Sequence, residues 1–253
     1  MSNTTHAEAL NRRAAIVALA AGAALAGSPA AAQGGSPVSP GAATSSLTAR
    51  QQAIAPIGAA MAIGDLPRLN AALNQGLDAG LSVSDAKEIL VQLYAYAGFP
   101  RSLNALGELM KVLDARKQRG VQDAPGREPA TALPTGKELL ALGTANQTRL
   151  SGAPVRGPLF EFAPQVDEYL KTHLFGDIFG RDNLDWQSRE LATVGALSAM
   201  TGVESQLQAH MRISMNVGLR PEQLRSVAET LAQRGQADAA NRARAALETV
   251  RKA

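Results

Sequence analysis

The sequence predicts an all-α protein, and its composition carries that prediction. Alanine is abundant and glycines punctuate the chain, whereas β-branched or aromatic runs are few, a balance that favours helices over strands. Of the 253 residues 45% are hydrophobic but only 4% are aromatic, so we expect a core of Ala, Leu, Val, Ile and Met. No segment shows the alternation of apolar and polar residues that is typical of a half-buried strand. A chain of this length is expected to hold one or two domains.

Charge and cysteine content exclude several classes of function. The formal net charge is +3, and the basic residues are scattered without interleaved aromatic residues, so nucleic acid is not an expected partner. Cysteine is absent from the sequence. Disulfides, thiolate metal sites and cysteine nucleophiles are therefore excluded, although the compartment is not fixed by this absence.

Residues 1–32 have the features of an export signal. Arg12 and Arg13 precede an uncharged run, residues 14–26, that is short for a membrane span, and Ser28-Pro-Ala-Ala-Ala32 offers an Ala-x-Ala cleavage site. The paired arginines indicate the twin-arginine route; a disordered Ala-rich tail is the alternative interpretation. We expect a periplasmic or secreted protein without membrane contact after cleavage. Residues 33–46 are expected to form a flexible leader.

Residues 47–118 are expected to form a first helical repeat. Thr48-Ala-Arg-Gln51 fits a capping box, so a helix should begin there and end before Gly64. Gly80 suits the left-handed position after a second helix, with Leu81 making the hydrophobic contact beyond it. Four successive helices are expected here, and they should end at about Ile63, Gly80, Tyr96 and Gln118. The third should start at Ala86, and Ser82 can cap it. The fourth should start at Arg101, after Gly98-Phe-Pro100.

Residues 119–136 are rich in glycine, proline and polar residues and are expected to be a linker. Residues 137–253 are expected to be a second helical repeat. A helix from about Gly136 to Thr148 should be followed by an irregular segment, residues 151–164, and by a helix from about Gln165 to Phe175. Asp185 can cap the next helix.

The two halves share a spaced pattern of residues, which predicts a tandem repeat. Five positions match at an offset of 137 residues, and seven more match at 138 after a one-residue insertion. At these offsets Glu190 corresponds to Ala53 and His210 to Ala72, so only the second repeat carries the acid and the histidine. The matched residues are Leu47, Ile54, Ile57, Gly58, Ala62, Leu69, Leu73, Leu77, Gly80, Leu81, Ile89 and Leu93 with Leu184, Leu191, Val194, Gly195, Ala199, Leu207, Met211, Met215, Gly218, Leu219, Val227 and Leu231.

Glu190 and His210 are the best chemical candidates. They lie on two predicted helices joined by a turn at Thr201-Gly202. At ~1.5 Å per residue, Glu190 is about 18 Å and His210 about 12 Å from this turn along the helix axes. Two long side chains can span the difference. A carboxylate beside an imidazole orients the ring and stabilises its charged form, and such a pair can move a proton to or from a carbon acid. The alternative is a structural histidine in the core and a glutamate that caps or pairs with Arg189 or Arg212.

Three further residues are weaker candidates. Arg149 and Arg156 can bind a substrate carboxylate, although solvated surface arginine is the plainer interpretation. His173 can act as a second ligand or base, or can lie in the core or at an interface. We expect no metal or cofactor, because the histidines do not form a ligand set and no phosphate-binding Gly-rich loop is present.

The segment 189–219 resembles the carboxymuconolactone decarboxylase family, which includes the alkyl hydroperoxidase D-like proteins. The first repeat resembles it through Gly80-Leu81 and through Leu93-Tyr-Ala-Tyr-Ala-Gly-Phe-Pro100. The resemblance covers about residues 47–113 and 139–235 and is closest in kind to the tandem two-repeat branch, in which segments like 146–150 and 157–160 also recur.

The resemblance implies an all-α fold whose units assemble into trimers or hexameric rings, so three two-unit chains would form a pseudo-hexamer. It also implies cofactor-free decarboxylation of a lactone carboxylic acid, with Glu190 and His210 matching the family's acid and histidine. Two departures matter. Val203 and Gln206 replace the two cysteines of the hydroperoxidase branch, which excludes thiol peroxidase chemistry, and Gln236-Ala-Asp238 stands where the first repeat has Gly-Phe-Pro.

Two hypotheses follow from these residues. The first is a decarboxylase or isomerase of a small lactone or keto acid, with Glu190 and His210 as the catalytic pair and Arg149 or Arg156 binding a carboxylate. The second is a non-enzymatic oligomeric protein that serves binding or assembly and retains the fold.

Overall fold

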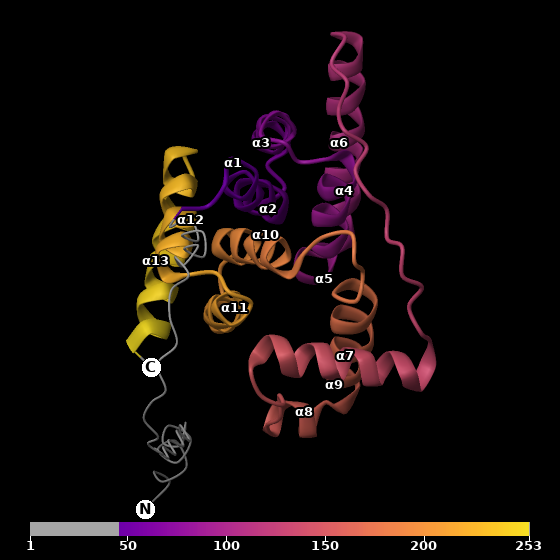
Figure 1. The fold of residues 1–253 in the computed structure, drawn as a ribbon. Coiled ribbons are helices and arrows are strands. Elements are labelled where there is room, and N and C mark those ends of the chain that lie inside the picture. Colours follow the sequence, from indigo (N-terminus) through magenta and orange to yellow (C-terminus); the bar gives the residue numbers. More distant parts are fainter. Residues whose placement is uncertain (1–45, 253) are drawn as a thin grey trace, which may run out of the picture. The chain divides into compact units, whose positions relative to one another are not determined.

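The computed structural model describes residues 46–252, and all its regular elements there are helices (Figure 1). The all-α prediction is confirmed. The predicted signal peptide, residues 1–32, lies outside the described residues, as does the leader apart from its last residue. Within the described part, no helix is both long and apolar enough to cross a membrane.

Helices α2 (Ile54–Ile63) and α10 (Trp186–Ala199) lie side by side at the centre of the described residues (Figure 1). Glycines make this contact close. A Cβ at Gly58 would lie 2.4 Å from the carbonyl oxygen of Ala192, and a Cβ at Gly195 would lie 2.2 Å from that of Ala55. The two contacts are equivalent, because Gly58 and Gly195, like Ala55 and Ala192, are separated by the predicted offset of 137 residues.

The first half of the chain builds one side of this centre. Its helices largely follow the sequence prediction, including the Thr48–Gln51 capping box. Two starts differ. α4 begins at Val83 rather than Ala86, because Ser82 and Asp85 form a second reciprocal capping box. α6 begins at Phe99 rather than Arg101, because a proline is tolerated in the first turn of a helix. Besides α2, the helices are α1 (Ala49–Gln52), α3 (Leu66–Asp78), α4 (Val83–Gln92), α5 (Tyr94–Ala97) and α6 (Phe99–Gln118).

The second half contains two departures from the prediction. The segment expected to be irregular holds a short helix, α8, which begins at Pro158, a residue whose fixed φ suits a first helical turn. The helix expected to end at Phe175 continues as a π-helix, η1, to Ile178. Besides α10, the elements are α7 (Gly136–Ser151), α8 (Pro158–Phe162), α9 (Pro164–Tyr169), η1 (Leu170–Ile178), α11 (Glu204–Asn216), α12 (Pro221–Gln233) and α13 (Ala237–Lys252).

The neighbours of the central helices correspond between the halves. α3 packs against α2 and α6, and α11 packs against α10 and α13. The Gly-Leu ends also agree: Gly80 and Gly218 have φ of 95° and 96°, and the next leucine N–H bonds back to Gly76 at 2.9 Å and to Ser214 at 3.0 Å. The tandem repeat stays a prediction, and this correspondence supports it.

The segment between α6 and α7 is extended and is held by both halves. Val83 N donates to Ala124 O at 2.9 Å, so the segment runs alongside the start of α4. Farther along, Asp182 accepts from the Ala130 backbone N–H and from the Thr131 hydroxyl, both at 3.0 Å. These hydrogen bonds, led by the one from Ala130, lower the pKa of Asp182 to about 2.

Candidate active site

The helical hairpin α10–α11 brings Glu190 and His210 into direct contact. His210 Nδ1 lies 2.8 Å from Glu190 Oε2. Glu190 has no solvent exposure, and His210 is 7% exposed. The two predicted site residues therefore meet without an intervening group, in a nearly dry environment.

Local signals fix the hairpin. Asp185 caps α10 by accepting from Ser188 N at 2.8 Å, as the sequence predicts. At the turn, Gly202 adopts a left-handed φ of 77° and donates its N–H to Glu204 Oε1 at 3.1 Å. Hydrogen bonds from its own backbone N–H and from Gly202 lower the pKa of Glu204, so its negative charge persists at the N-terminus of α11.

Tyr96 from the first half completes the site. Its ring meets the His210 ring edge-on, with centroids 5.4 Å apart and planes at 77°. Burial, with the charge of Glu190 in second place, raises the pKa of Tyr96, so its phenol stays protonated. Sequence reasoning missed Tyr96 as a site residue, although the Leu93–Pro100 segment that contains it carries part of the family resemblance.

Two polar atoms at this site have no hydrogen-bond partner in the described structure. They are Glu190 Oε1 and the hydroxyl of Tyr96, both buried. A buried polar group left unpaired costs about 1–3 kcal/mol, and it is more costly for a charged group. The site therefore keeps a carboxylate oxygen that the fold does not use, and a phenol hydroxyl beside the Thr193 side chain.

Arg189, which precedes Glu190 in sequence, forms an ion pair with Glu88. It is fully buried, and its Nη2 lies 2.8 Å from Glu88 Oε1 on α4. Arg181 Nε lies 2.9 Å from the same oxygen. Burial alone would raise the pKa of Glu88, but the two guanidinium groups outweigh it and the pKa is lowered. Glu190 thus pairs with His210 and not with Arg189, which settles one alternative left open by the sequence.

Gln92 ties the backbone of α10 to α4. Its Nε2 donates to Arg189 O at 2.9 Å and to Thr193 Oγ1 at 2.8 Å, and its Oε1 accepts from Arg189 Nη1 at 3.1 Å. Both Gln92 and Thr193 are fully buried. Gln92 therefore holds α10 at the residue before Glu190 and at the residue three positions after it.

Neither predicted carboxylate-binding arginine contacts the pair within the described residues. The Arg149 guanidinium lies 4.9 Å from the centre of the Trp186 ring, in an open pocket that Gln187 and Asn216 also line. Arg156 is exposed between α7 and α8. Their role in binding a substrate stays a prediction.

His173 forms a separate pair on η1. Its Nδ1 lies 2.7 Å from Asp177 Oδ2, and 46% of its side chain is exposed, so it is not a core residue. Its ring centre lies 5.5 Å from that of Tyr94. Across residues 46–252, no group of three or more His, Asp or Glu side chains is arranged to hold a metal ion.

The fold and the site together define an all-α protein with a buried acid–histidine pair on a helical hairpin. Residues 164–249 match the carboxymuconolactone decarboxylase family, and this part of the chain is a domain of that family. The match includes Glu190 and His210. A comparison with curated proteins gives no match. The resemblance of the first half to the same family stays a prediction.

Proposed function

We propose that the protein moves a proton at a carbon atom of a small lactone or keto acid, in a cofactor-free decarboxylation or isomerisation. The observation that carries the proposal is the 2.8 Å contact between His210 Nδ1 and a fully buried Glu190. A buried carboxylate that accepts from one imidazole nitrogen fixes the tautomer and leaves the other nitrogen for chemistry.

The two residues have different roles in this proposal. Glu190 is a positioning residue, because solvent does not reach it. His210 is the catalytic residue, and its free nitrogen, Nε2, exchanges the proton with the substrate. Tyr96 keeps its own proton and offers a hydrogen-bond donor beside the imidazole.

The proposed decarboxylation balances without an added reactant. The bond between the substrate carbon and its carboxylate breaks, CO₂ leaves, and the electron pair passes into a conjugated carbonyl to give an enolate. The protonated imidazole then donates its Nε2 proton to the carbon, and water restores that proton. In an isomerisation, neutral His210 would instead remove a proton beside the carbonyl and return it to another carbon.

The test measures CO₂ release and lactone absorbance with purified protein and a γ-lactone carboxylic acid. His210→Asn is expected to lower kcat at least about 100-fold, the usual contribution of a general acid or base. Glu190→Gln should shift the pH profile as well as lower kcat, since it removes the partner that fixes the imidazole. His173→Asn is the matched control, a histidine paired with a carboxylate but remote from the site, and should leave kcat unchanged.

Two results would contradict this proposal. One is turnover that survives His210→Asn. The other is an absence of turnover with any lactone or keto acid, together with a melting temperature that falls in His210→Asn, which would make the pair structural.

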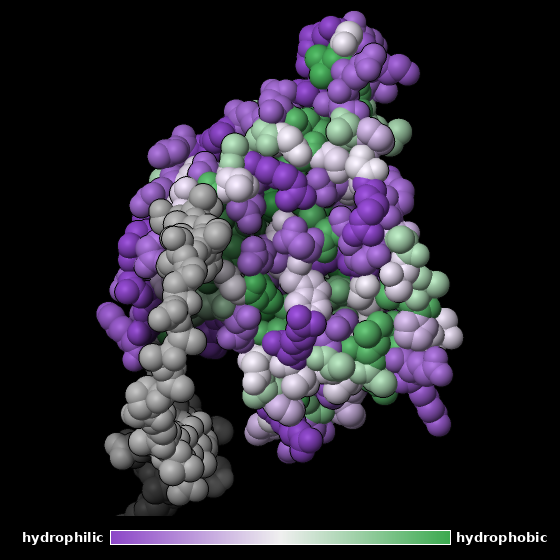
Figure 2. All heavy atoms as spheres, viewed as in Figure 1, coloured by the Kyte–Doolittle hydropathy of each residue, from purple (hydrophilic) through white to green (hydrophobic). Residues whose placement is uncertain are grey.

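Exposed apolar side chains favour assembly, which is also the second candidate function. Figure 2 shows hydrophobic surface over the α7–α9 region. Phe162 is 88% exposed on α8 and Tyr169 62% on α9, while α6 exposes Leu103 at 63%. Side chains of this size are costly to leave in water, so they support an interface with further copies of the chain.

We therefore propose a homo-oligomer, with a trimer of two-unit chains as the specific expectation. Light scattering of purified protein measures the mass. Phe162→Ser together with Tyr169→Ser should reduce the assembly, whereas a monomeric unsubstituted protein would contradict the proposal. If the protein assembles but shows no turnover, the non-enzymatic alternative is favoured.

A further inference from the structure

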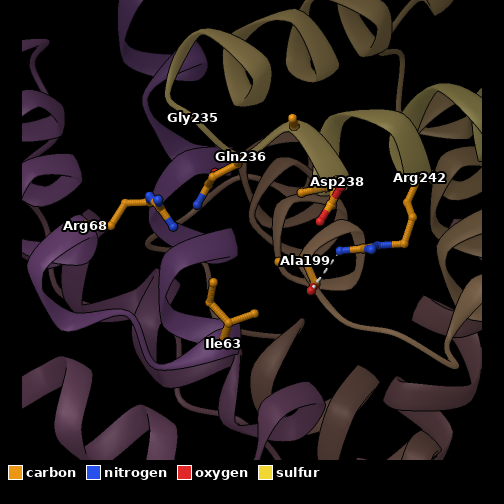
Figure 3. Close-up of a pocket in the computed structure, with 9 residues that line it drawn as sticks. Ile63, Arg68, Ala199, Gly235, Gln236, Asp238 and Arg242 are labelled. Carbon is orange, nitrogen blue, oxygen red and sulfur yellow. Dashed lines mark hydrogen bonds between the residues drawn. The ribbon is translucent and has the colours of Figure 1, made fainter.

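A pocket of about 320 Å³ lies where the α2–α3 turn faces the start of α13 (Figure 3). The first half contributes Ile63 and Arg68, and the second half contributes the end of α10 and the first turns of α13. None of its lining residues belongs to the Glu190–His210 site, so a ligand here would be additional to the proposed substrate.

Gln236 is the unusual residue of this pocket. It is 6% exposed, and neither its amide oxygen nor its amide nitrogen has a hydrogen-bond partner within the described residues. Its backbone is fully used, because its N–H donates to Leu231 O at 2.9 Å and its carbonyl accepts from Ala240 N at 3.0 Å. Figure 3 shows the amide pointing into the pocket toward Arg68. A buried amide that the fold leaves unpaired in both directions points to a ligand that can pair with it.

Two guanidinium groups line the same pocket, and each is held in place. Arg68 Nη1 lies 2.7 Å from Asp65 Oδ2. Arg242 donates from Nε to Ser198 O at 2.7 Å and from Nη2 to Ala199 O at 3.1 Å. Arg68 Nη2 and Arg242 Nη1 take part in none of these hydrogen bonds and can donate to a ligand anion.

The start of α13 adds to the positive field. This helix has 16 residues, and the N–H groups of its first turn have no acceptors inside the helix. Such a terminus favours an anion. Three acids moderate the charge: Asp65 pairs with Arg68, exposed Asp238 lines the pocket and supplies an acceptor, and Glu204 interacts electrostatically with Arg242. The pocket thus offers donors for an anion and acceptors for a neighbouring donor.

We propose that this pocket binds a small organic carboxylate that also carries a hydroxyl or amide donor. Arg68, Arg242 and the first turn of α13 bind the carboxylate. Gln236 Nε2 donates to a ligand oxygen, and Gln236 Oε1 accepts from the ligand's hydroxyl or amide. The requirement for both groups distinguishes this ligand from a simple anion.

The sequence explains why the pocket is confined to one half. Gln236-Ala-Asp238 stands where the first half has Gly98-Phe-Pro100, at an offset of 138 residues. Gly98 has no side chain to turn inward, and Phe99 is 60% exposed at the start of α6. The substitution of this motif therefore supplies the two side-chain acceptors of the pocket.

Titration calorimetry with three probes tests the proposal. L-lactate carries both groups, acetate lacks the hydroxyl, and lactamide lacks the charge. Lactate is expected to bind at least about fivefold more tightly than acetate, as one additional hydrogen bond predicts. It should also bind more tightly than lactamide, which lacks the charge that the guanidinium groups attract. Gln236→Leu should abolish this preference for lactate over acetate, and Arg68→Gln should weaken both anions. Gln233→Leu, at an exposed glutamine three residues earlier, is the matched control and should bind lactate normally.

The melting temperature of each variant separates a lost site from a lost fold. Gln236→Leu removes two unpaired polar atoms and should not lower it. If that variant does not fold, partly exposed Arg68 still provides the test. Absence of saturable lactate binding, equal binding of acetate and lactate, or lactate binding that is unchanged in Gln236→Leu or in Arg68→Gln would overturn the proposal. None of these measurements depends on turnover at His210.

Discussion

The substitution Gly195→Ala tests the close contact between α2 and α10. The added methyl group would lie 2.2 Å from the carbonyl oxygen and 2.7 Å from the Cα of Ala55. Both are backbone atoms, so no side-chain rotation relieves the overlap and the two helices must move apart. Overpacking in a core typically costs about 1–3 kcal/mol, and a backbone clash between two buried helices places this case near the upper value.

The assay is thermal unfolding followed by circular dichroism. About 3 kcal/mol lowers the melting temperature by roughly 6–12 °C for a chain of this size, at about 2–4 °C per kcal/mol. Gly58→Ala should behave alike, since its methyl group would lie 2.4 Å from Ala192 O. Ala55→Gly should not rescue Gly195→Ala, because the overlap is with the backbone of residue 55.

Gly107→Ala is the matched control. It also lies inside a helix, α6, but a Cβ added there would have no neighbouring atom within 4 Å, so the substitution should stabilise the protein by up to about 1 kcal/mol. An unchanged melting temperature in Gly195→Ala, or an equal loss in Gly107→Ala, would show that α2 and α10 are not in close backbone contact.

Three further predictions concern ionisation and processing. Glu88→Gln should destabilise the protein by about 3–5 kcal/mol, because Arg189 would remain buried without its counter-charge. The folded state lowers the pKa of Glu88, so this stability is present above the unfolded pKa and is lost as pH falls through the folded pKa. In urea unfolding at acid pH, the free energy of unfolding should therefore depend less on pH in the variant than in the unsubstituted protein. The raised pKa of Tyr96 predicts that ultraviolet titration near pH 10 is the same in Tyr96→Phe as in the unsubstituted protein, and a lost absorbance step would contradict it. Mass spectrometry of exported protein should find a mature N-terminus at Gln33, and an intact Met1 or Ser2 would count against cleavage.

Much of the fold was predictable because its signals are local. Thr48, Ser82 and Asp185 are caps whose partners lie three residues away, and Gly80 and Gly218 end helices through their own backbone conformation. The start of α4 was placed three residues too late although its cap, Ser82, was recognised, because the reciprocal bond with Asp85 puts Val83 in the first turn. The presence of α8 was missed because five residues are too few to show a helical periodicity.

The π-helix η1 depends on packing and could not be predicted from its own residues. A Cβ at Gly143 on α7 would lie 1.6 Å from the carbonyl oxygen of Lys171, so the two elements touch through their backbones. Gly176 takes part in the same contact, with the Leu139 side chain 2.9 Å from where its Cβ would lie. This approach involves residues far apart in sequence, and periodicity along one segment carries no information about it.

The candidate site divides in the same way. Glu190 and His210 were predictable as a pair because one short turn separates their helices. Tyr96 was not, because its contact with His210 depends on how the two halves pack. The unpaired side-chain amide of Gln236 was also not predictable, because the pocket that buries it is lined by residues from both halves of the chain.

The ion pair between Glu88 and Arg189 has a consequence for the modularity of the chain. The half that carries Glu190 and His210 also contains a fully buried arginine whose carboxylate partner is on the other half. An excised second half would expose one face of α10 and leave that guanidinium without its counter-charge. The half that lacks the acid and the histidine therefore stabilises the half that has them, by supplying the counter-charge of Arg189.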